Sequence, residues 1–218
     1  MFIFDALHSI ITYSILKLLF KKANSMTPDQ RKKLEEKKAN LQLQIQLNEF
    51  IQDRINPFIE ILEILTALQI KHQVVKLRCI PQKFHQPLKV FIENNPIAKH
   101  LPADITITSE DSEIEEILVQ YPSANPFRYV SDSPTIGYGN LPNEILSELL
   151  EAQHLGEEKV FICWLTYAFL VEINLQELAE RANTDLFNFW YSDALIFPKD
   201  NNWLISFSLE DEWRFKRE

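Results

Sequence analysis

The residue types that most often perform catalysis or bind metals are sparse in this sequence. It has two cysteines, Cys79 and Cys163, and five histidines, none paired at the spacing that places two ligands on one helix face. No serine stands between glycines at nucleophile-elbow spacing, and neither HExxH nor Cys-x-x-Cys occurs. A cysteine and a distant histidine could still meet as nucleophile and base. Since Cys163 lies in the apolar run 160–165 and free cysteine is usually buried, we expect an inert core thiol there.

Glycine is equally scarce, with three residues in a chain of 218. Phosphate-binding loops and dinucleotide fingerprints need clustered glycines, because only glycine lets the backbone approach a phosphate closely. Gly137, Gly139 and Gly156 do not form such a cluster, which excludes these nucleotide-binding classes. Two cysteines are also too few for a disulfide framework or a four-cysteine zinc site. We therefore predict a protein that is not an enzyme and that uses no metal and no cofactor.

An acidic stretch at residues 110–116 is the first candidate for a binding feature. A calcium loop would need a glycine at its sharp turn, and this stretch has none. Two interpretations remain. The carboxylates occupy the first turns of a helix, where the helix dipole favours them, or they form a docking face for a basic partner. Under the second interpretation the partner-binding residues are Glu110, Asp111 and Glu113.

Aromatic residues are dense near the C-terminus, between Phe187 and Phe215. Aromatic side chains commonly dominate cores, and the alternation of residues 203, 205 and 207 places all three on one face of a strand. The alternative is a partly exposed tryptophan that acts as a binding anchor with an acidic rim. The residues of that alternative are Trp190, Asp193, Glu210, Asp211, Glu212 and Trp213.

The formal charge of −9 conceals two unequal parts of the chain. Residues 1–90 contain 14 Lys+Arg and 8 Asp+Glu, a balance of +6, whereas residues 91–218 contain 8 and 23, a balance of −15. An acidic C-terminal part repels nucleic acid and attracts basic proteins, because long-range fields steer encounter. The simpler interpretation is that the charge only keeps the protein soluble.

Residues 2–20 form a largely apolar stretch, as secretory signals and membrane helices do. A secretory signal would have a positive start and a small-residue cleavage site, and polar residues interrupt the run that a transmembrane helix needs. Apolar residues recur at steps of three and four, which predicts an amphipathic helix. Its apolar face either packs on the protein or lies on a membrane surface, in which case residues 1–22 make the contact and the basic residues 31–38 assist.

The rest of residues 1–70 also predicts helices. Thr27 and Pro28 are suited to the N-cap and first position of a long helix at 29–55. Residues 41–47 alternate as in a strand, but they are good helix formers with no turn signal beside them. We expect Pro57 to break or kink this helix and a third helix to follow at 58–69. Residues 1–70 are thus predicted to form a helical hairpin or small bundle.

The central part, residues 71–158, is a mixed α/β segment interrupted by prolines. We expect strands at 73–80 and 105–108, a helix from about 110 to 120 capped by Ser109 with Ser112 or Asp111 close by, and a surface loop at 131–140. Another helix should run from Pro142 to a stop near Gly156.

Residues 159–218 predict an antiparallel β-meander with short helices. Strands are expected at 160–166, 167–174, 194–197, 203–208 and 213–216, with a helix at 175–181 capped by Asn174. The fold class is α+β: an N-terminal helical hairpin or bundle, followed by an antiparallel sheet with packed helices. Residues 71–218 are expected to form one domain.

The C-terminal sequence resembles a known group of proteins. The string from Tyr191 to Asp200, then residues 203–206 and Glu210-Asp211, is similar to the ends of small bacterial proteins, many of them immunity proteins paired with polymorphic or contact-dependent toxins. This resemblance implies a protein that binds and blocks a cognate toxin and has no catalysis of its own. An acidic surface would then suit a basic toxin such as a nuclease.

Taken together, these features favour a non-enzymatic, cytoplasmic binding protein of immunity type. Its partner would be a basic protein, such as a toxin domain, and not a nucleic acid. The second hypothesis is a peripheral membrane or scaffold protein that uses its amphipathic N-terminal helix. The sequence leaves the oligomeric state open.

Overall fold

The computed structural model describes residues 27–94, 101–102, 104–126, 135–138, 141–156, 158–187 and 192–217. The chain divides into two compact units, Met1–Asn48 and Glu49–Glu218. The helix predicted at 2–20 and the candidate Trp190 lie outside the described residues.

Helix α2 (Pro28–Phe50) begins at a reciprocal cap and has no buried residue. The N–H of Gln30 donates to Thr27 Oγ1 over 3.3 Å, and the N–H of Thr27 donates to Gln30 Oε1 over 3.0 Å. This capping box satisfies two backbone donors that no helical carbonyl can reach. The alternating residues 41–47 are helical, as predicted, because glutamine and leucine both favour the helix where no sheet competes for them.

The chain stays helical through Pro57. A π-helical segment, Ile51–Ile55, is followed by α3 (Asn56–Ala67), in whose first turn Pro57 lies. Proline is tolerated in a first turn because its missing N–H would have no partner there. Of the predicted break or kink, the break is absent, and the helix instead changes type directly before the proline.

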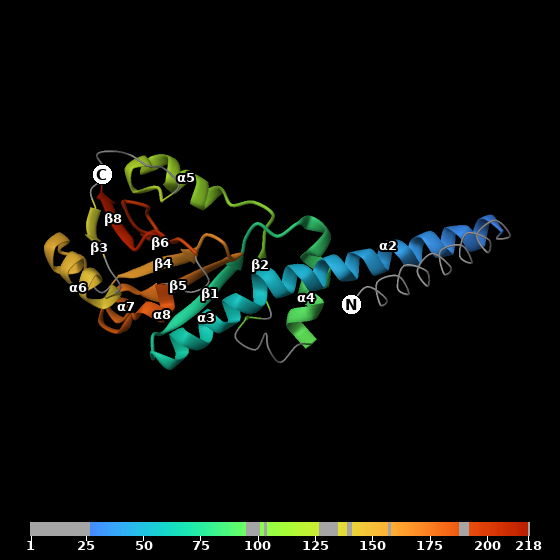
Figure 1. The fold of residues 1–218 in the computed structure, drawn as a ribbon, viewed down its shortest axis with the longest axis horizontal. Coiled ribbons are helices and arrows are strands. Elements are labelled where there is room, and N and C mark those ends of the chain that lie inside the picture. Colours follow the sequence, from blue (N-terminus) through green and yellow to red (C-terminus); the bar gives the residue numbers. More distant parts are fainter. Residues whose placement is uncertain are drawn as a thin grey trace, which may run out of the picture. The chain divides into compact units, whose positions relative to one another are not determined.

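One eight-stranded sheet, shown in Figure 1, has the order β2-β1-β5-β4-β6-β7-β8-β3. The neighbouring strands are antiparallel except for β1 and β2, which are parallel. The sheet confirms the predicted α+β class. Its strands are β1 (His72–Leu77), β2 (Thr106–Ile107), β3 (Thr135–Tyr138), β4 (Lys159–Trp164), β5 (Phe169–Asn174), β6 (Ala194–Pro198), β7 (Trp203–Phe207) and β8 (Glu212–Arg217).

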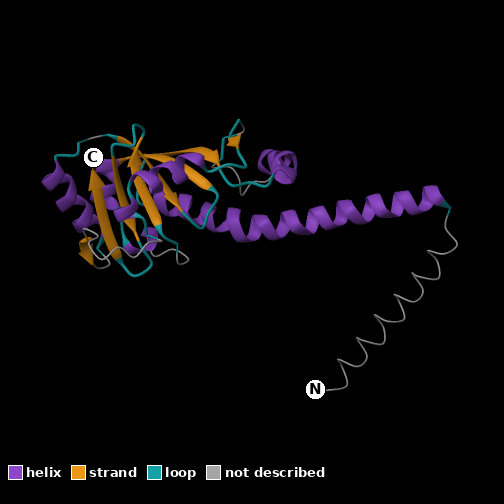
Figure 2. Cartoon of the chain, turned by 90° about the horizontal axis from the view of Figure 1, so that it is seen from above, coloured by secondary structure: helices purple, strands orange, loops and turns teal. Residues whose placement is uncertain are grey.

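Helices cover both faces of this sheet, with α5 on the opposite side from α3 and α8 (Figures 1 and 2). Besides α2 and α3, the helices are η2 (Gln82–Phe84), α4 (His85–Asn94), α5 (Ser112–Gln120), η4 (Pro122–Ala124), α6 (Pro142–Gln153), α7 (Leu175–Arg181) and α8 (Thr184–Phe187).

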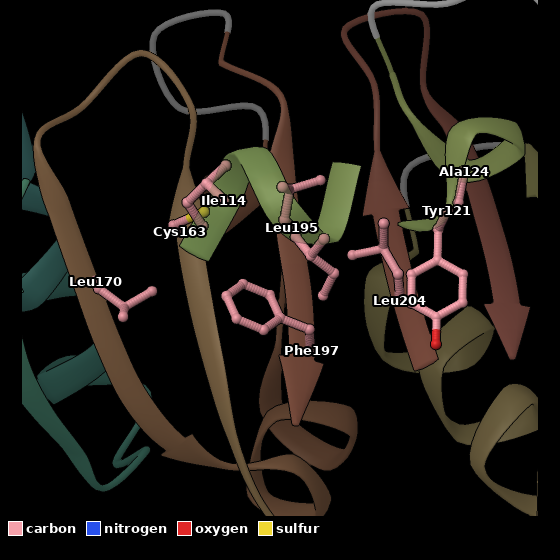
Figure 3. Packing of buried hydrophobic residues seen from close by; sticks show 9 residues of the cluster. Ile114, Tyr121, Ala124, Cys163, Leu170, Leu195, Phe197 and Leu204 are labelled. Carbon is pink, nitrogen blue, oxygen red and sulfur yellow. The ribbon is translucent and has the colours of Figure 1, made fainter. Parts of the chain in front are cut away.

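The α5 side of the sheet holds one apolar cluster, drawn in Figure 3. Ile114 and Ile117 of α5 contribute to it from the helix, and Cys163 and Leu195 contribute from the sheet. Because side chains alternate along a strand, the next residue on β4, Trp164, lies on the other face. A continuous apolar strand such as β4 is therefore explained by burial on both faces.

The other face of the sheet is dominated by aromatic rings. Phe58 of α3 stacks on Phe169 with ring centroids 3.5 Å apart, and Phe187 of α8 lies edge-on to Trp213 at 4.7 Å. Trp203 and Trp213 are fully buried. The core interpretation of the C-terminal aromatic residues therefore holds for these two.

One local prediction is wrong and one helix was missed. Residues 135–138 of the predicted loop form β3, because pairing with β8 satisfies their backbone groups. Helix α4 was not expected; its proline, Pro87, lies in the first turn, where it costs no hydrogen bond. The helix predicted from Pro142 is present as α6 and ends at Gln153, where His154, left-handed at φ 53°, is the C-cap in place of Gly156.

Candidate functional site: the turn end of the sheet

The strand register gathers several separate loops at one end of the sheet. Leu77 pairs with Phe169, so the end of β1 lies beside the start of β5. Along the sheet, Ala194 at the start of β6 pairs with both Trp164 and Phe207. We call this end the turn end; it comprises Arg78, the N-terminus of α5 (110–111), the β4–β5 turn (165–168), Ser192–Asp193 and the β7–β8 turn (208–211).

Hydrogen bonds connect these loops to one another. The N–H of Leu165 donates to the carbonyl of Asp193 over 2.8 Å, and the N–H of Thr166 donates to Ser192 Oγ over 3.1 Å. Asp193 continues the connection, because its Oδ1 accepts the N–H of Leu209 over 2.9 Å. The turns are thus fixed relative to one another, and this end of the sheet has a preformed surface.

Arg78 is the most heavily bonded side chain of the turn end. Its guanidinium donates to the carbonyls of Trp164 and Tyr167 over 3.2 and 3.0 Å, and it is ion-paired with Asp111 at the N-terminus of α5. Only 2% of Arg78 is exposed. Burial acts to lower the pKa of Arg78, but the nearby thiols and the Asp111 carboxylate raise this pKa by more than burial lowers it. Arg78 therefore stays charged. The pair joins the β4–β5 turn to α5.

The β7–β8 turn presents an apolar side chain among carboxylates. The N–H of Asp211 donates to the carbonyl of Ser208 over 3.0 Å, and Asp211 is left-handed at φ 58°, which aspartate tolerates better than most residues. The loop proper, residues 209–211, leaves Leu209 48% exposed beside the exposed Glu210. The turn therefore combines accessible apolar area with negative charge.

A second arginine, Arg214, is buried beneath this turn. It donates to Glu212 Oε2 over 2.5 Å and to the carbonyl of Asn125 over 3.2 Å. Because Arg78 and Arg214 are both buried and paired with carboxylates, neither presents its positive charge to solvent. An exposed cation, Arg54, donates to the Thr166 carbonyl.

Asp193 is the half-buried acid at the centre of this end. Burial raises its pKa above the ordinary value, and the neighbouring Glu210 acts in the same direction. The Leu209 N–H and Arg214 oppose this effect. Asp193 fixes the turn through its bond to the Leu209 N–H, and Glu110 and Glu210 are exposed acids at this end.

The structure places most of the predicted partner-binding residues at or beside this end. Glu110 is exposed and Asp111 is held by Arg78, whereas Glu113 lies further along α5 and pairs with Lys76 over 2.7 Å. The second predicted group is brought to the same end by the β7–β8 turn: Asp193, Glu210, Asp211 and Glu212.

Trp213 is not an exposed anchor. It is fully buried, and its Nε1 has no hydrogen-bond partner. The anchor interpretation is therefore wrong for Trp213, because the side chain follows the strand alternation onto the covered face, where it packs on Phe187 and Phe207. The exposed apolar residue is Leu209, four positions earlier.

The two cysteines and one serine–histidine contact are the groups that resemble catalytic ones in the described residues. Cys163 is buried, and burial raises its pKa to about 11. Cys79 is exposed, and its pKa is raised by desolvation and by Asp111, so its thiol is a weak nucleophile.

His85 contacts Ser109 but is poorly suited to activate it. His85 Nε2 lies 3.0 Å from Ser109 Oγ and 2.9 Å from the carbonyl of Ile80. A carbonyl can only accept, so Nε2 carries the proton and cannot act as the base for the serine. In the described part of the chain, no three His, Cys, Asp or Glu side chains form a group that could hold a metal ion.

Sequence reasoning missed Arg78, Arg214 and Leu209. An arginine that follows a strand gives no local signal of burial, since its partners come from segments far apart in the chain. Leu209 lies in an acidic turn sequence, where a single leucine gives no sequence signal of a binding role. Comparison of the chain with protein-family models, curated proteins and solved structures finds no match.

Proposed function

We propose that this protein is a non-enzymatic binding module that uses the turn end to bind a basic protein. One observation carries the proposal: the β7–β8 turn presents Leu209 beside the exposed carboxylate of Glu210 on a loop fixed by Asp193. Binding surfaces with an apolar contact and a charged rim combine buried area with steering. A fixed loop also avoids much of the entropy cost of ordering on binding.

The charge at this end supports a basic partner. Glu110 and Glu210 face solvent, while Arg78 and Arg214 are buried against carboxylates and Arg54 is an exposed cation at the β4–β5 turn. The C-terminal part of the chain has a balance of −15 over residues 91–218, so its field extends beyond these few groups. A nucleic acid would be repelled, and a basic protein would be attracted.

The resemblance of residues 191–211 to immunity-type proteins favours a toxin domain as the basic partner. In that case the chain blocks the toxin by covering it, and the raised pKa of the exposed Cys79 thiol agrees with a role without catalysis. The partner would be encoded beside this protein.

The test is co-expression of the full chain with the product of the adjacent reading frame. We expect a 1:1 complex and protection of the host cell. Leu209→Ser should weaken this complex about tenfold, because a half-exposed leucine loses about 1.4 kcal/mol of burial. The control is Leu141→Ser, which removes a leucine of similar exposure, 55%, from the start of α6. Equal affinity of both variants, or no complex at all, would refute the proposal.

A further inference from the structure

We infer that the protein has a second binding face, formed by helix α2 and independent of the turn end. This face would lie on an anionic membrane surface. Among the described helices, none is both long and apolar enough to span a bilayer. The contact would therefore be made along the surface, by a helix lying in the plane of the interface.

The face consists of a narrow apolar stripe on a mostly polar helix, whose other two leucines, Leu43 and Leu47, lie on the opposite side. A helix turns about 100° per residue, so Leu34, Leu41 and Ile45 lie within about 40° of one another. All three are exposed, with 49%, 58% and 49% of their surface accessible. The stripe extends about 16 Å along the helix, since each residue rises about 1.5 Å.

Cations border this stripe on both sides. By the same geometry Arg31, Lys37 and Lys38 lie within about 60° of the centre of the stripe. Asp29 and Glu36 lie about 140–160° away and Glu35 about 100° away, while Glu49, one turn beyond Ile45, lies about 60° away. In the described part of the chain the three border cations form no ion pair. Long basic side chains beside an apolar stripe can extend to lipid headgroups while their stems cover apolar surface.

The sequence before α2 favours a bilayer over a second copy of this chain. Thirteen of the nineteen residues 2–20 are apolar, and Lys21 and Lys22 follow them directly. Three half-exposed residues of α2 offer too little apolar area to cover so many side chains. Stable attachment to a membrane usually needs two signals, and an apolar segment followed by a basic-bordered helix supplies both.

The experiment is flotation of the full chain with vesicles of phosphatidylcholine, with and without phosphatidylserine. We expect flotation with the anionic vesicles and much less with the neutral ones. R31Q/K37Q/K38Q should lower partitioning about a hundredfold, because each cation near an anionic surface contributes about a fivefold gain. Glutamine is a good helix former, so α2 is retained.

A matched control separates position from net charge. The variant K32Q/K89Q/K199Q removes the same number of cations from exposed positions outside the border of the stripe, and it should bind like the wild type. L34Q/L41Q/I45Q tests the stripe itself and should also lose binding. Amide exchange in α2 should slow when vesicles are added.

Four results would overturn the inference. They are no flotation of the full chain, equal loss in the border variant and its control, unchanged binding of L34Q/L41Q/I45Q, and association of the chain with itself in place of lipid. None of them concerns Leu209 or the basic partner, so they leave the proposed function intact.

Discussion

Replacing Arg78 with methionine tests the physical basis of the turn end. The change removes a buried guanidinium that donates to the carbonyls of Trp164, Tyr167 and Phe169 and pairs with Asp111. Methionine fills similar space but donates nothing, so the carbonyls and the carboxylate lose their partner together.

The expected cost follows from these contacts. Breaking a buried ion pair by removing one partner costs about 3–5 kcal/mol. The 14% exposure of the Asp111 side chain lets the carboxylate recover some water, which favours the lower part of that range. In a chain of this size each kcal/mol lowers Tm by about 2–4 °C, so we expect a loss of at least about 6 °C.

Urea unfolding followed by tryptophan fluorescence measures the free energy of unfolding directly. Arg54→Met is the matched control, because Arg54 is exposed and donates to the Thr166 carbonyl in the same turn. It should change stability by no more than about 0.5 kcal/mol. Asp111→Asn should cost about 1–2 kcal/mol, since the carbonyls keep their donor. A loss below about 1 kcal/mol for R78M would refute the assigned role of this arginine.

Three further predictions concern other buried groups. Trp164→Phe should cost about 1–2 kcal/mol more in urea unfolding than Trp213→Phe, because only the Trp164 Nε1 has an acceptor, a carbonyl of α8 at 3.0 Å; equal costs would contradict this. The raised pKa of Asp193 means that its contribution to stability is present below its ordinary value of 3.8 and is lost as pH rises through the native pKa. The stability of D193N relative to wild type should therefore increase from acid to neutral pH, and a pH-independent difference would refute it. A thiol reagent should label Cys79 in the native protein and Cys163 only after unfolding, and rapid labelling of both would be the contrary result.

Local sequence signals predicted the helices and strands where one residue type decides the structure. Thr27 and Asn174 cap α2 and α7 through the expected side-chain hydrogen bonds. The apolar run at β4 predicted a strand covered on both faces, and the sheet confirms it. These signals depend on neighbours within a few residues, which the sequence shows directly.

Predictions failed where distant segments decide the structure. Residues 135–138 form a strand because β8 offers an edge, and nothing in their own sequence indicates that pairing. The turn end was predicted only as separate acidic groups, because its coherence comes from strand register and from Arg78. The sequence left two alternatives for Trp213, a core residue or an exposed binding anchor. The alternation of side chains along β8 places it in the core.

The central claim, that the turn end steers a basic partner, is tested most directly by association kinetics with the product of the adjacent reading frame. The variant E110Q/E210Q/D211N removes three carboxylates from this end, and E148Q/E151Q/E180Q removes three exposed ones from α6 and α7. We predict that the wild-type association rate falls steeply with added salt, and that only the turn-end variant is slower, with a weaker salt dependence. Equal slowing of both variants, or a rate that is insensitive to salt, would contradict the account.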